Sequence, residues 1–196
     1  MPIGSRHPHV QQHTTGKTRD LPISDALADL LEAAALRANI DIVWIYSGGQ
    51  CAAGTCSKRT GSTRHDLGGA ADIHLVVSGR RLNFDDASDR KVFALFLETC
   101  AAYGAEGIGA ATDYMGPTAA HVGFGGRAVW GRNGKSANAP VWLRSAVARG
   151  WSSRNRVLGA PSDQADEEKI FEELLQSLPD SPNAEVEPLP DDYDAS

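Results

Sequence analysis

The hydrophobic pattern of the first quarter of the chain predicts one helix followed by one strand. Over residues 22–38, leucines and alanines recur every three or four positions, which is the spacing of one face of an α-helix. Ser24 stands where an N-cap would satisfy free N–H groups, and Asn39 fits the end of the helix. The β-branched and aromatic run at residues 40–46 then predicts a strand, which ends in the turn at residues 47–49.

Later segments alternate between the strand and helix patterns. The predicted strands cover residues 69–77, 81–84, 107–110 and 119–124, and the predicted helices cover residues 89–103, 140–149 and 166–178. Gly150 follows one of these helices and is expected to end it. We therefore expect an α+β fold, in which helices flank a small antiparallel sheet.

A long loop at residues 49–64, rich in Gly, Ser, Thr and basic residues, separates the first two predicted strands. Loops of this length in compact domains are usually functional or mobile. It contains Cys51 and Cys56, which have three interpretations: a small disulfide loop, two thiolate ligands, or two free loop thiols. With Cys100 the cysteine count is odd, which argues against a pure disulfide framework, and no second pair completes a four-thiolate zinc site.

Composition divides the chain into three parts. Residues 1–20 are polar and hold three of the six histidines, which predicts a disordered leader rather than a metal-binding tract. Residues 21–158 have the composition of one globular domain. Residues 159–196 carry twelve acidic residues and one lysine, which predicts an acidic helix and a disordered tail. Because the whole chain has a net charge of −6, the first 162 residues carry +5.

These properties limit the partners. A mildly basic body suits an anionic polymer such as the cell wall, but its charge is too small and too scattered to indicate nucleic acid. No apolar run reaches the roughly 18 residues that a membrane-spanning helix needs. The N-terminus lacks the apolar stretch of a signal peptide, so we expect the protein to be made in the cytoplasm; if its substrate lies outside, another system must export it. We also expect a monomer.

Candidate chemistry gathers between the long loop and the strand after it. His65 ends the loop and Asp72 lies in the strand, and imidazole and carboxylate are both good ligands of Zn²⁺. His121, in a later strand, can supply a third ligand, which leaves one position for water as a catalytic zinc site requires. A lone strand histidine is more often a core residue, whereas a strand carboxylate needs a partner to offset desolvation. His74 shares a face with Asp72 and either supports the ligands or is structural.

Residues 65–72 match the pattern H-x-x-G-x-A-x-D, with His65, Gly68, Ala70 and Asp72 at its fixed positions. This stretch resembles the zinc motif of the D-Ala-D-Ala metallopeptidase family, which includes phage endopeptidases and the hedgehog signalling domain. The order of the predicted elements is similar to that of the family. The Gly-Ile-Gly segment at residues 107–109 and a tryptophan after the last strand are similar to the family as well. The resemblance implies a hedgehog/DD-peptidase-like fold, Zn²⁺ held by His65, Asp72 and His121, and hydrolysis of a peptidoglycan stem peptide.

The chain departs from that family at several positions, of which the catalytic base and one arginine matter most. The general base, a Glu two or three places before the last histidine, is replaced by Thr118 and Ala119, and the Arg after the Ser-Gly turn is replaced by Gln50. We therefore expect Asp113 to act as the base, although a residue that caps its own turn is the alternative. Substrate contacts are expected from Gln50, Ser47 and Tyr114, with a partly buried loop aromatic as the alternative for Tyr114.

Three functions are consistent with these features. The first is an endolysin-like zinc carboxypeptidase or endopeptidase, which a phage lysis system would release to the cell wall. The second is a zinc-containing module that binds the wall without cleaving it, which the missing Glu favours. The third is a structural part of a phage particle, for which the acidic tail at residues 159–196 would be a docking segment.

Overall fold

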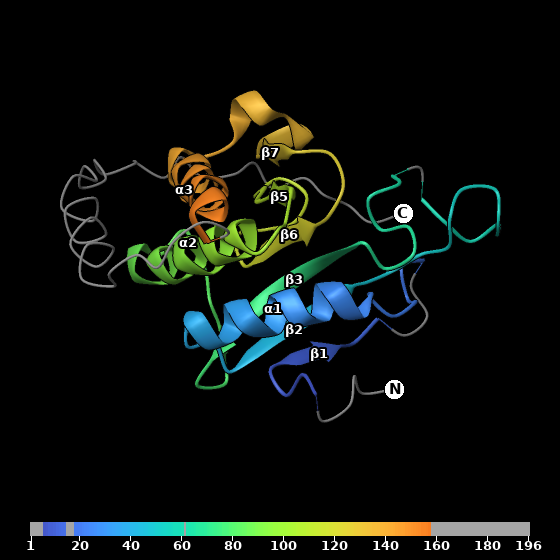
Figure 1. The fold of residues 1–196 in the computed structure, drawn as a ribbon, viewed down its shortest axis with the longest axis horizontal. Helices are drawn as coiled ribbons and strands as arrows, with labels where there is room; N and C mark the ends of the chain where they lie inside the picture. Colours follow the sequence, from blue (N-terminus) through green and yellow to red (C-terminus); the bar gives the residue numbers. More distant parts are fainter. Residues whose placement is uncertain (1–5, 15–17, 61, 158–196) are drawn as a thin grey trace, which may run out of the picture. The chain divides into compact units, whose positions relative to one another are not determined.

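A computed structural model of the chain describes residues 6–14, 18–60 and 62–157. In this part the chain forms a mixed α/β domain of one sheet and three α-helices (Figure 1). None of these helices is long and apolar enough to cross a membrane. The helix predicted over residues 166–178 and the rest of the acidic tail lie outside the described residues.

The sheet runs in the order β1-β2-β3-β6-β5-β7, with β4 also paired to β3. Its strands are β1 (Val10–Gln12), β2 (Ile42–Ser47), β3 (Ala70–Val77), β4 (Arg80–Arg81), β5 (Gly107–Gly109), β6 (Ala119–Gly123) and β7 (Ala128–Trp130). The central strands β2, β3, β6 and β5 pair antiparallel, as predicted, whereas the edge strands β1 and β7 each pair in parallel with their neighbour. The predicted antiparallel sheet is therefore confirmed only for its centre.

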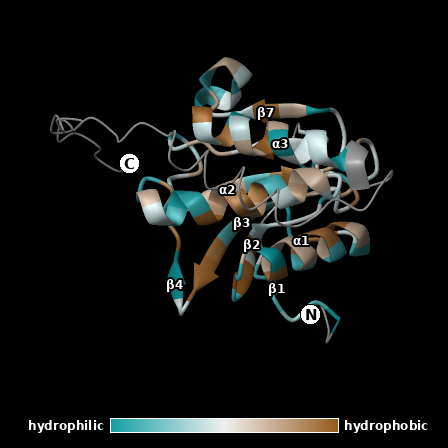
Figure 2. Cartoon of the chain, turned by 60° about the vertical axis from the view of Figure 1, so that its left-hand side comes forward, coloured by the Kyte–Doolittle hydropathy of each residue, from teal (hydrophilic) through white to brown (hydrophobic). Residues whose placement is uncertain are grey.

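Three helices accompany the sheet. They are α1 (Asp25–Arg37), α2 (Ala87–Ala102) and α3 (Val141–Val157), and two short 3₁₀ turns (Arg132–Gly134 and Ser136–Asn138) precede α3. The predicted cap of α1 is confirmed, because the Ser24 hydroxyl accepts a hydrogen bond from the Leu27 N–H at 3.3 Å. Figure 2 shows hydrophobic and hydrophilic residues around each helix, as expected when one side of a helix lies in the core.

The two faces of the sheet have different roles. Ile45 and Ile73 are completely buried in the hydrophobic core with residues of all three helices. The residues that alternate with them, including Tyr46, Asp72 and His74, are only partly buried. Since successive side chains of a strand point to opposite faces, the partly buried face is where the polar side chains gather.

The prediction of a disordered leader is wrong for its described residues. Residues 10–12 form β1, and two histidine–carboxylate contacts attach the preceding turn to α1. His7 Nε2 lies 2.8 Å from Asp29 Oδ1, and His9 Nδ1 lies 2.5 Å from Glu32 Oε1. The polar composition concealed this strand, because an edge strand of three residues needs backbone hydrogen bonds more than an apolar pattern.

The predicted end of the last helix is also wrong, because α3 continues through Gly150 to Val157. A Cβ atom on Gly150 would overlap the Glu98 carbonyl oxygen and the side chain of Ala101, both in α2. The glycine therefore permits close contact between α2 and α3 instead of ending a helix.

We expect Gly150→Ala to lower the free energy of unfolding by up to about 2 kcal/mol. The added methyl group overpacks the contact between the two helices, which costs about 1–3 kcal/mol, while alanine stabilises a helix interior by about 1 kcal/mol relative to glycine. Urea denaturation measures the difference. Gly126→Ala is the matched control, because nothing lies within 4 Å of the added Cβ there; equal or higher stability of Gly150→Ala would contradict the expectation.

Candidate metal centre

The register of two neighbouring strands brings the first two candidate ligands together. Asp72 of β3 is the direct antiparallel partner of His121 of β6. Their side chains therefore lie on the same face of the sheet, and His121 Nδ1 lies 2.8 Å from Asp72 Oδ1.

The third candidate ligand, His65, is positioned by a tight turn before β3. The His65 carbonyl accepts a hydrogen bond from the Gln50 N–H at 2.9 Å, and the Gln50 carbonyl accepts one from the Leu67 N–H at 2.8 Å. Gly68 follows with φ of 76°, and a Cβ atom there would approach the backbone of Ser24 too closely. The turn thus requires glycine, which lets it pack against the start of α1.

His65 is almost completely buried, with 1% of its surface exposed, and its ring is held in one orientation. Its Nδ1 lies 2.8 Å from the carbonyl oxygen of Gly48, which must accept the hydrogen bond, so Nδ1 carries the proton. Nε2 is then the atom with a free lone pair, and it lies 3.6 Å from Asp72 Oδ1. A backbone acceptor on the outer nitrogen is the usual support for a metal-binding histidine.

One cation could be held by His65, Asp72 and His121, whose ligand atoms all lie within 4.8 Å of one another. The donor set, two imidazole nitrogens and one carboxylate, is suited to Zn²⁺. His121 supports this assignment, because its Nε2 is buried without a hydrogen-bond partner among the described residues. A buried polar atom of this kind needs an explanation, and a ring that serves as a ligand rather than a structural hydrogen-bonding group provides one.

The ionisation of Asp72 and His121 also suits a cation. Burial of Asp72 by itself raises the pKa of its carboxyl group, but interactions with the neighbouring His121 and His65 rings outweigh burial and hold that pKa well below its usual value. Burial lowers the pKa of His121, although the hydrogen bond to Asp72 acts in the opposite direction. At neutral pH the centre therefore presents a carboxylate and a neutral His121 ring, which are the forms that bind metal.

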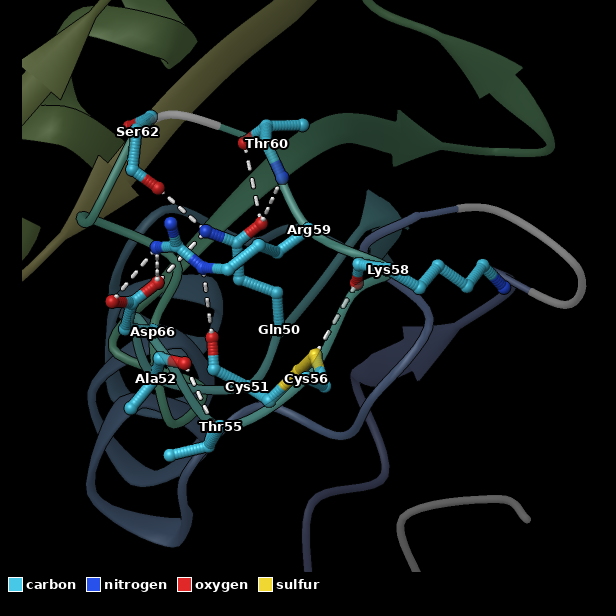
Figure 3. Close-up of a disulfide and its surroundings, with 10 residues drawn as sticks. All are labelled: Gln50, Cys51, Ala52, Thr55, Cys56, Lys58, Arg59, Thr60, Ser62 and Asp66. Atoms are coloured by element: carbon cyan, nitrogen blue, oxygen red, sulfur yellow. Dashed lines mark hydrogen bonds and ion pairs between the residues drawn. A yellow bond between two sulfur atoms is a disulfide. The ribbon is translucent and has the colours of Figure 1, made fainter.

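Within the long loop before His65, a disulfide joins Cys51 to Cys56 (Figure 3). Of the three interpretations of this pair, the structure therefore supports the first. The third cysteine, Cys100, is free and buried, and burial raises the pKa of its thiol.

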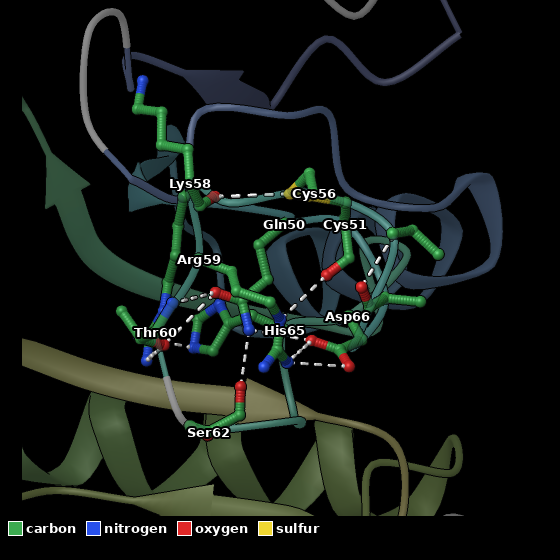
Figure 4. Close-up of polar contacts among 12 residues, drawn as sticks. Gln50, Cys51, Cys56, Lys58, Arg59, Thr60, Ser62, His65 and Asp66 are labelled. Carbon is green, nitrogen blue, oxygen red and sulfur yellow. Dashed lines mark hydrogen bonds and ion pairs between the residues drawn. A yellow bond between two sulfur atoms is a disulfide. The ribbon is translucent and has the colours of Figure 1, made fainter.

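Figures 3 and 4 show the Gln50 side chain among the residues of this loop. Its amide nitrogen donates to Asp66 Oδ1 at 2.8 Å and to the Ser62 carbonyl, and its Oε1 accepts from the Thr60 N–H at 3.0 Å. Arg59 also donates to Asp66, at 2.7 Å. With 1% exposure and its polar atoms occupied, Gln50 does not provide the predicted substrate contact.

Asp113 is not brought to the centre either. Its Oδ2 accepts a hydrogen bond from the Asn133 N–H at 2.6 Å, and Asp113 is not among the residues that line the adjacent cleft. The carboxylate thus bonds a loop segment twenty residues away and does not cap its own turn. Nothing in this placement supports the predicted role as base.

A cleft of about 580 Å³ opens beside the three candidate ligands. Ser47 and Tyr114 line it, and their contact with a substrate stays a prediction. Its other lining residues include Arg19, Tyr46, Ser62, Arg64, Met115 and Trp130. Among the lining residues in the described part of the chain, Asp72 has the only carboxylate.

One wall of the cleft depends on the glycines of β5. A Cβ atom on Gly109 would overlap the indole ring of Trp130, and one on Gly107 would overlap the guanidinium group of Arg64. The Arg64 guanidinium lies 5.0 Å from the centre of the Trp130 ring, and Trp130 Nε1 donates to the Tyr114 hydroxyl oxygen at 2.8 Å. The Gly-Ile-Gly segment thus makes room for side chains that face the centre.

Arg19 is a residue of the candidate centre that sequence reasoning missed. Its Nη1 lies 3.0 Å from His65 Nε2 and 3.2 Å from Asp72 Oδ2. No local pattern indicated this contact, because Arg19 belongs to the polar segment that was interpreted as a disordered leader.

No protein-family model and no curated protein sequence matches the chain. The geometry of the centre and the local resemblance of residues 65–72 therefore carry the functional argument.

We expect His65→Ala to abolish binding of stoichiometric Zn²⁺ and to remove the thermal stabilisation that the ion provides, because binding energy adds to folding energy. Zinc content by atomic spectroscopy and melting temperatures with and without zinc measure both effects. His74→Ala is the matched control: its ring stacks on Tyr46 on the same face of the sheet, but it lies outside the ligand cluster. Equal zinc content in both variants would reject the assignment of His65.

Proposed function

We propose that this protein is a zinc-dependent hydrolase that cleaves a peptide bond in the stem peptides of peptidoglycan, as a carboxypeptidase or an endopeptidase. The observation that carries the proposal is the convergence of His65, Asp72 and His121 beside an open cleft. Three protein ligands are the number that catalytic zinc sites use, whereas structural zinc sites usually have four. The resemblance of residues 65–72 to the D-Ala-D-Ala metallopeptidase motif supports the substrate class.

In this mechanism His65, Asp72 and His121 hold the ion. A bound zinc ion supplies Lewis-acid polarisation of the scissile carbonyl and lowers the pKa of water. The Asp72 carboxylate provides the negative charge of the ligand set, and the Gly48 carbonyl keeps the His65 ring in the tautomer that leaves Nε2 free.

Tyr114 is placed to act on the substrate. The Trp130 N–H donates to the Tyr114 oxygen, so the phenolic hydrogen is free to donate to a ligand in the cleft. Burial is the largest influence on the Tyr114 pKa and raises it, so the hydroxyl keeps its proton at neutral pH. A neutral donor at this position can stabilise the negative charge that develops on a carbonyl oxygen.

One observation favours a second candidate, a wall-binding protein that holds zinc without hydrolysis. Apart from Asp72, no carboxylate lines the cleft among the described residues, so a separate group that could take a proton from water is not evident there. In that case the same centre and cleft would bind the wall peptide and leave it intact.

Digestion of purified peptidoglycan, with mass spectrometry of the fragments, separates these candidates. We expect the zinc-loaded protein to release peptide fragments, a chelator to stop their release, and added Zn²⁺ to restore it. A co-sedimentation assay with the same peptidoglycan is run in parallel. Zinc-dependent sedimentation without any released fragment would contradict the hydrolase and support the binding protein.

Neighbouring residues provide a test of which groups act in hydrolysis. We expect Tyr114→Phe to lower kcat by about tenfold or more, since it removes one donor to the carbonyl oxygen. Asp113→Asn should change kcat less than tenfold, because the Asp113 carboxylate binds the Asn133 backbone and lies outside the cleft. Steady-state kinetics on a defined stem peptide, at equal zinc content, measure both. A larger loss for Asp113→Asn than for Tyr114→Phe would reverse the assignment.

A further inference from the structure

We propose that Arg19 is an internal competitor of the metal ion: its guanidinium group occupies the cation position of the metal-free centre and must leave when the ion binds. The inference rests on the proposed zinc centre, which it extends with a mechanism that controls metal loading. It assigns a role to the N-terminal segment at residues 18–21, which the hydrolytic mechanism does not use.

The Arg19 guanidinium group contacts the candidate ligand atoms directly. Its Nη1 is within hydrogen-bond distance of two candidate ligands at once, 3.0 Å from His65 Nε2 and 3.2 Å from Asp72 Oδ2. The Nε2 atom is the one whose lone pair is free for a metal, because the Gly48 carbonyl accepts the proton of the other ring nitrogen. Arg19 therefore uses the same lone pair that a bound ion would use.

Electrostatics gives the reason for this arrangement. The ionised Asp72 side chain is only 14% exposed, and a carboxylate in such a place needs a positive partner. Arg19 supplies that charge when no ion is present. A divalent ion at the same ligands would repel the guanidinium group and compete for the same electron pairs. Arginine and metal are therefore alternative partners of one carboxylate.

The backbone around Arg19 is anchored, so that only the side chain has to move. The Gly48 N–H donates to the Arg19 carbonyl at 2.9 Å, while the Gly48 carbonyl accepts from His65 at 2.8 Å. The backbone of one residue, Gly48, thus holds both the candidate ligand and its competitor. Leu21 and Gly49 exchange two further backbone hydrogen bonds, at 3.1 and 2.8 Å, which fasten the end of the segment.

The side chain itself is held less completely than its backbone. Nη2 donates to the Thr60 hydroxyl oxygen at 3.1 Å, but Nε is buried without a partner among the described residues. A buried N–H without a hydrogen-bond partner destabilises this position of the guanidinium group, because the N–H loses its hydrogen bonds to water and gains none. Arg19 can therefore be displaced by an ion that binds the ligands more strongly.

The experiment measures zinc affinity and metal-free stability of the full chain, with Arg19→Ala and Arg19→Gln as variants. Arg144→Ala, at an exposed position of α3, is the control for loss of one positive charge. Competition with a chromophoric chelator gives the affinity, and thermal melting of the chelator-treated protein gives the stability. Arg19→Gln keeps much of the side-chain volume, so it separates the effect of charge from that of packing.

We expect both Arg19 variants to bind zinc about tenfold or more tightly than the natural chain and Arg144→Ala. In the metal-free form we expect both variants to melt at a lower temperature, because Asp72 loses its counter-charge. These opposite effects on zinc affinity and metal-free stability distinguish a competitor from a residue that merely supports the fold, whose loss would weaken both.

Three results would overturn the proposal. If all four proteins bind zinc with equal affinity, Arg19 does not compete and the zinc centre itself stands. If none of them binds zinc, the centre and the competition fail together. Weaker binding by both Arg19 variants would instead make Arg19 a supporting residue of the loaded site.

Discussion

The pairing of β3 with β6 places Asp72 opposite His121, and the chemistry of this protein depends on that register. Strand side chains alternate between the two faces of a sheet, so a shift of one residue would turn Asp72 toward the core. Ile73, which now packs completely buried against the helices, would then face the cleft. Loss of apolar burial and desolvation of a carboxylate both oppose that shift. The hydrophobic core therefore selects the register that assembles the centre.

Residues without large side chains provide the space around these strands. Gly68 lets the turn that carries His65 pack against the start of α1, and Gly109 makes room for Trp130 beside His121. Ala71 and Ala120, both fully buried next to the ligand positions, keep the sheet close to the helices. The centre is thus preorganised by packing on one face of the sheet, which leaves the other face open for a ligand.

The same preorganisation creates an electrostatic requirement. Asp72 is largely buried and its pKa is held well below the usual value, so the carboxylate remains charged at neutral pH and needs a cation. The structure offers Arg19, and the ligand geometry suits Zn²⁺. A hydrolase with such a centre would have two stable forms, one neutralised by its own arginine and one by the ion. This connects the proposed function with the position of the N-terminal segment.

Periodicity and a local motif were sufficient to predict the three helices in the described part, the central strands and the closeness of His65 and Asp72, because each depends on residues that are close in sequence. Three placements depended on tertiary structure. Gln50 and Asp113 turn away from the cleft because hydrogen bonds to Asp66 and to Asn133 are available to them, and Arg19 reaches the centre because the Gly48 N–H holds its backbone. Local sequence patterns report which side of an element is buried, whereas the partner of a polar side chain is decided by whichever distant groups the fold brings within hydrogen-bond distance.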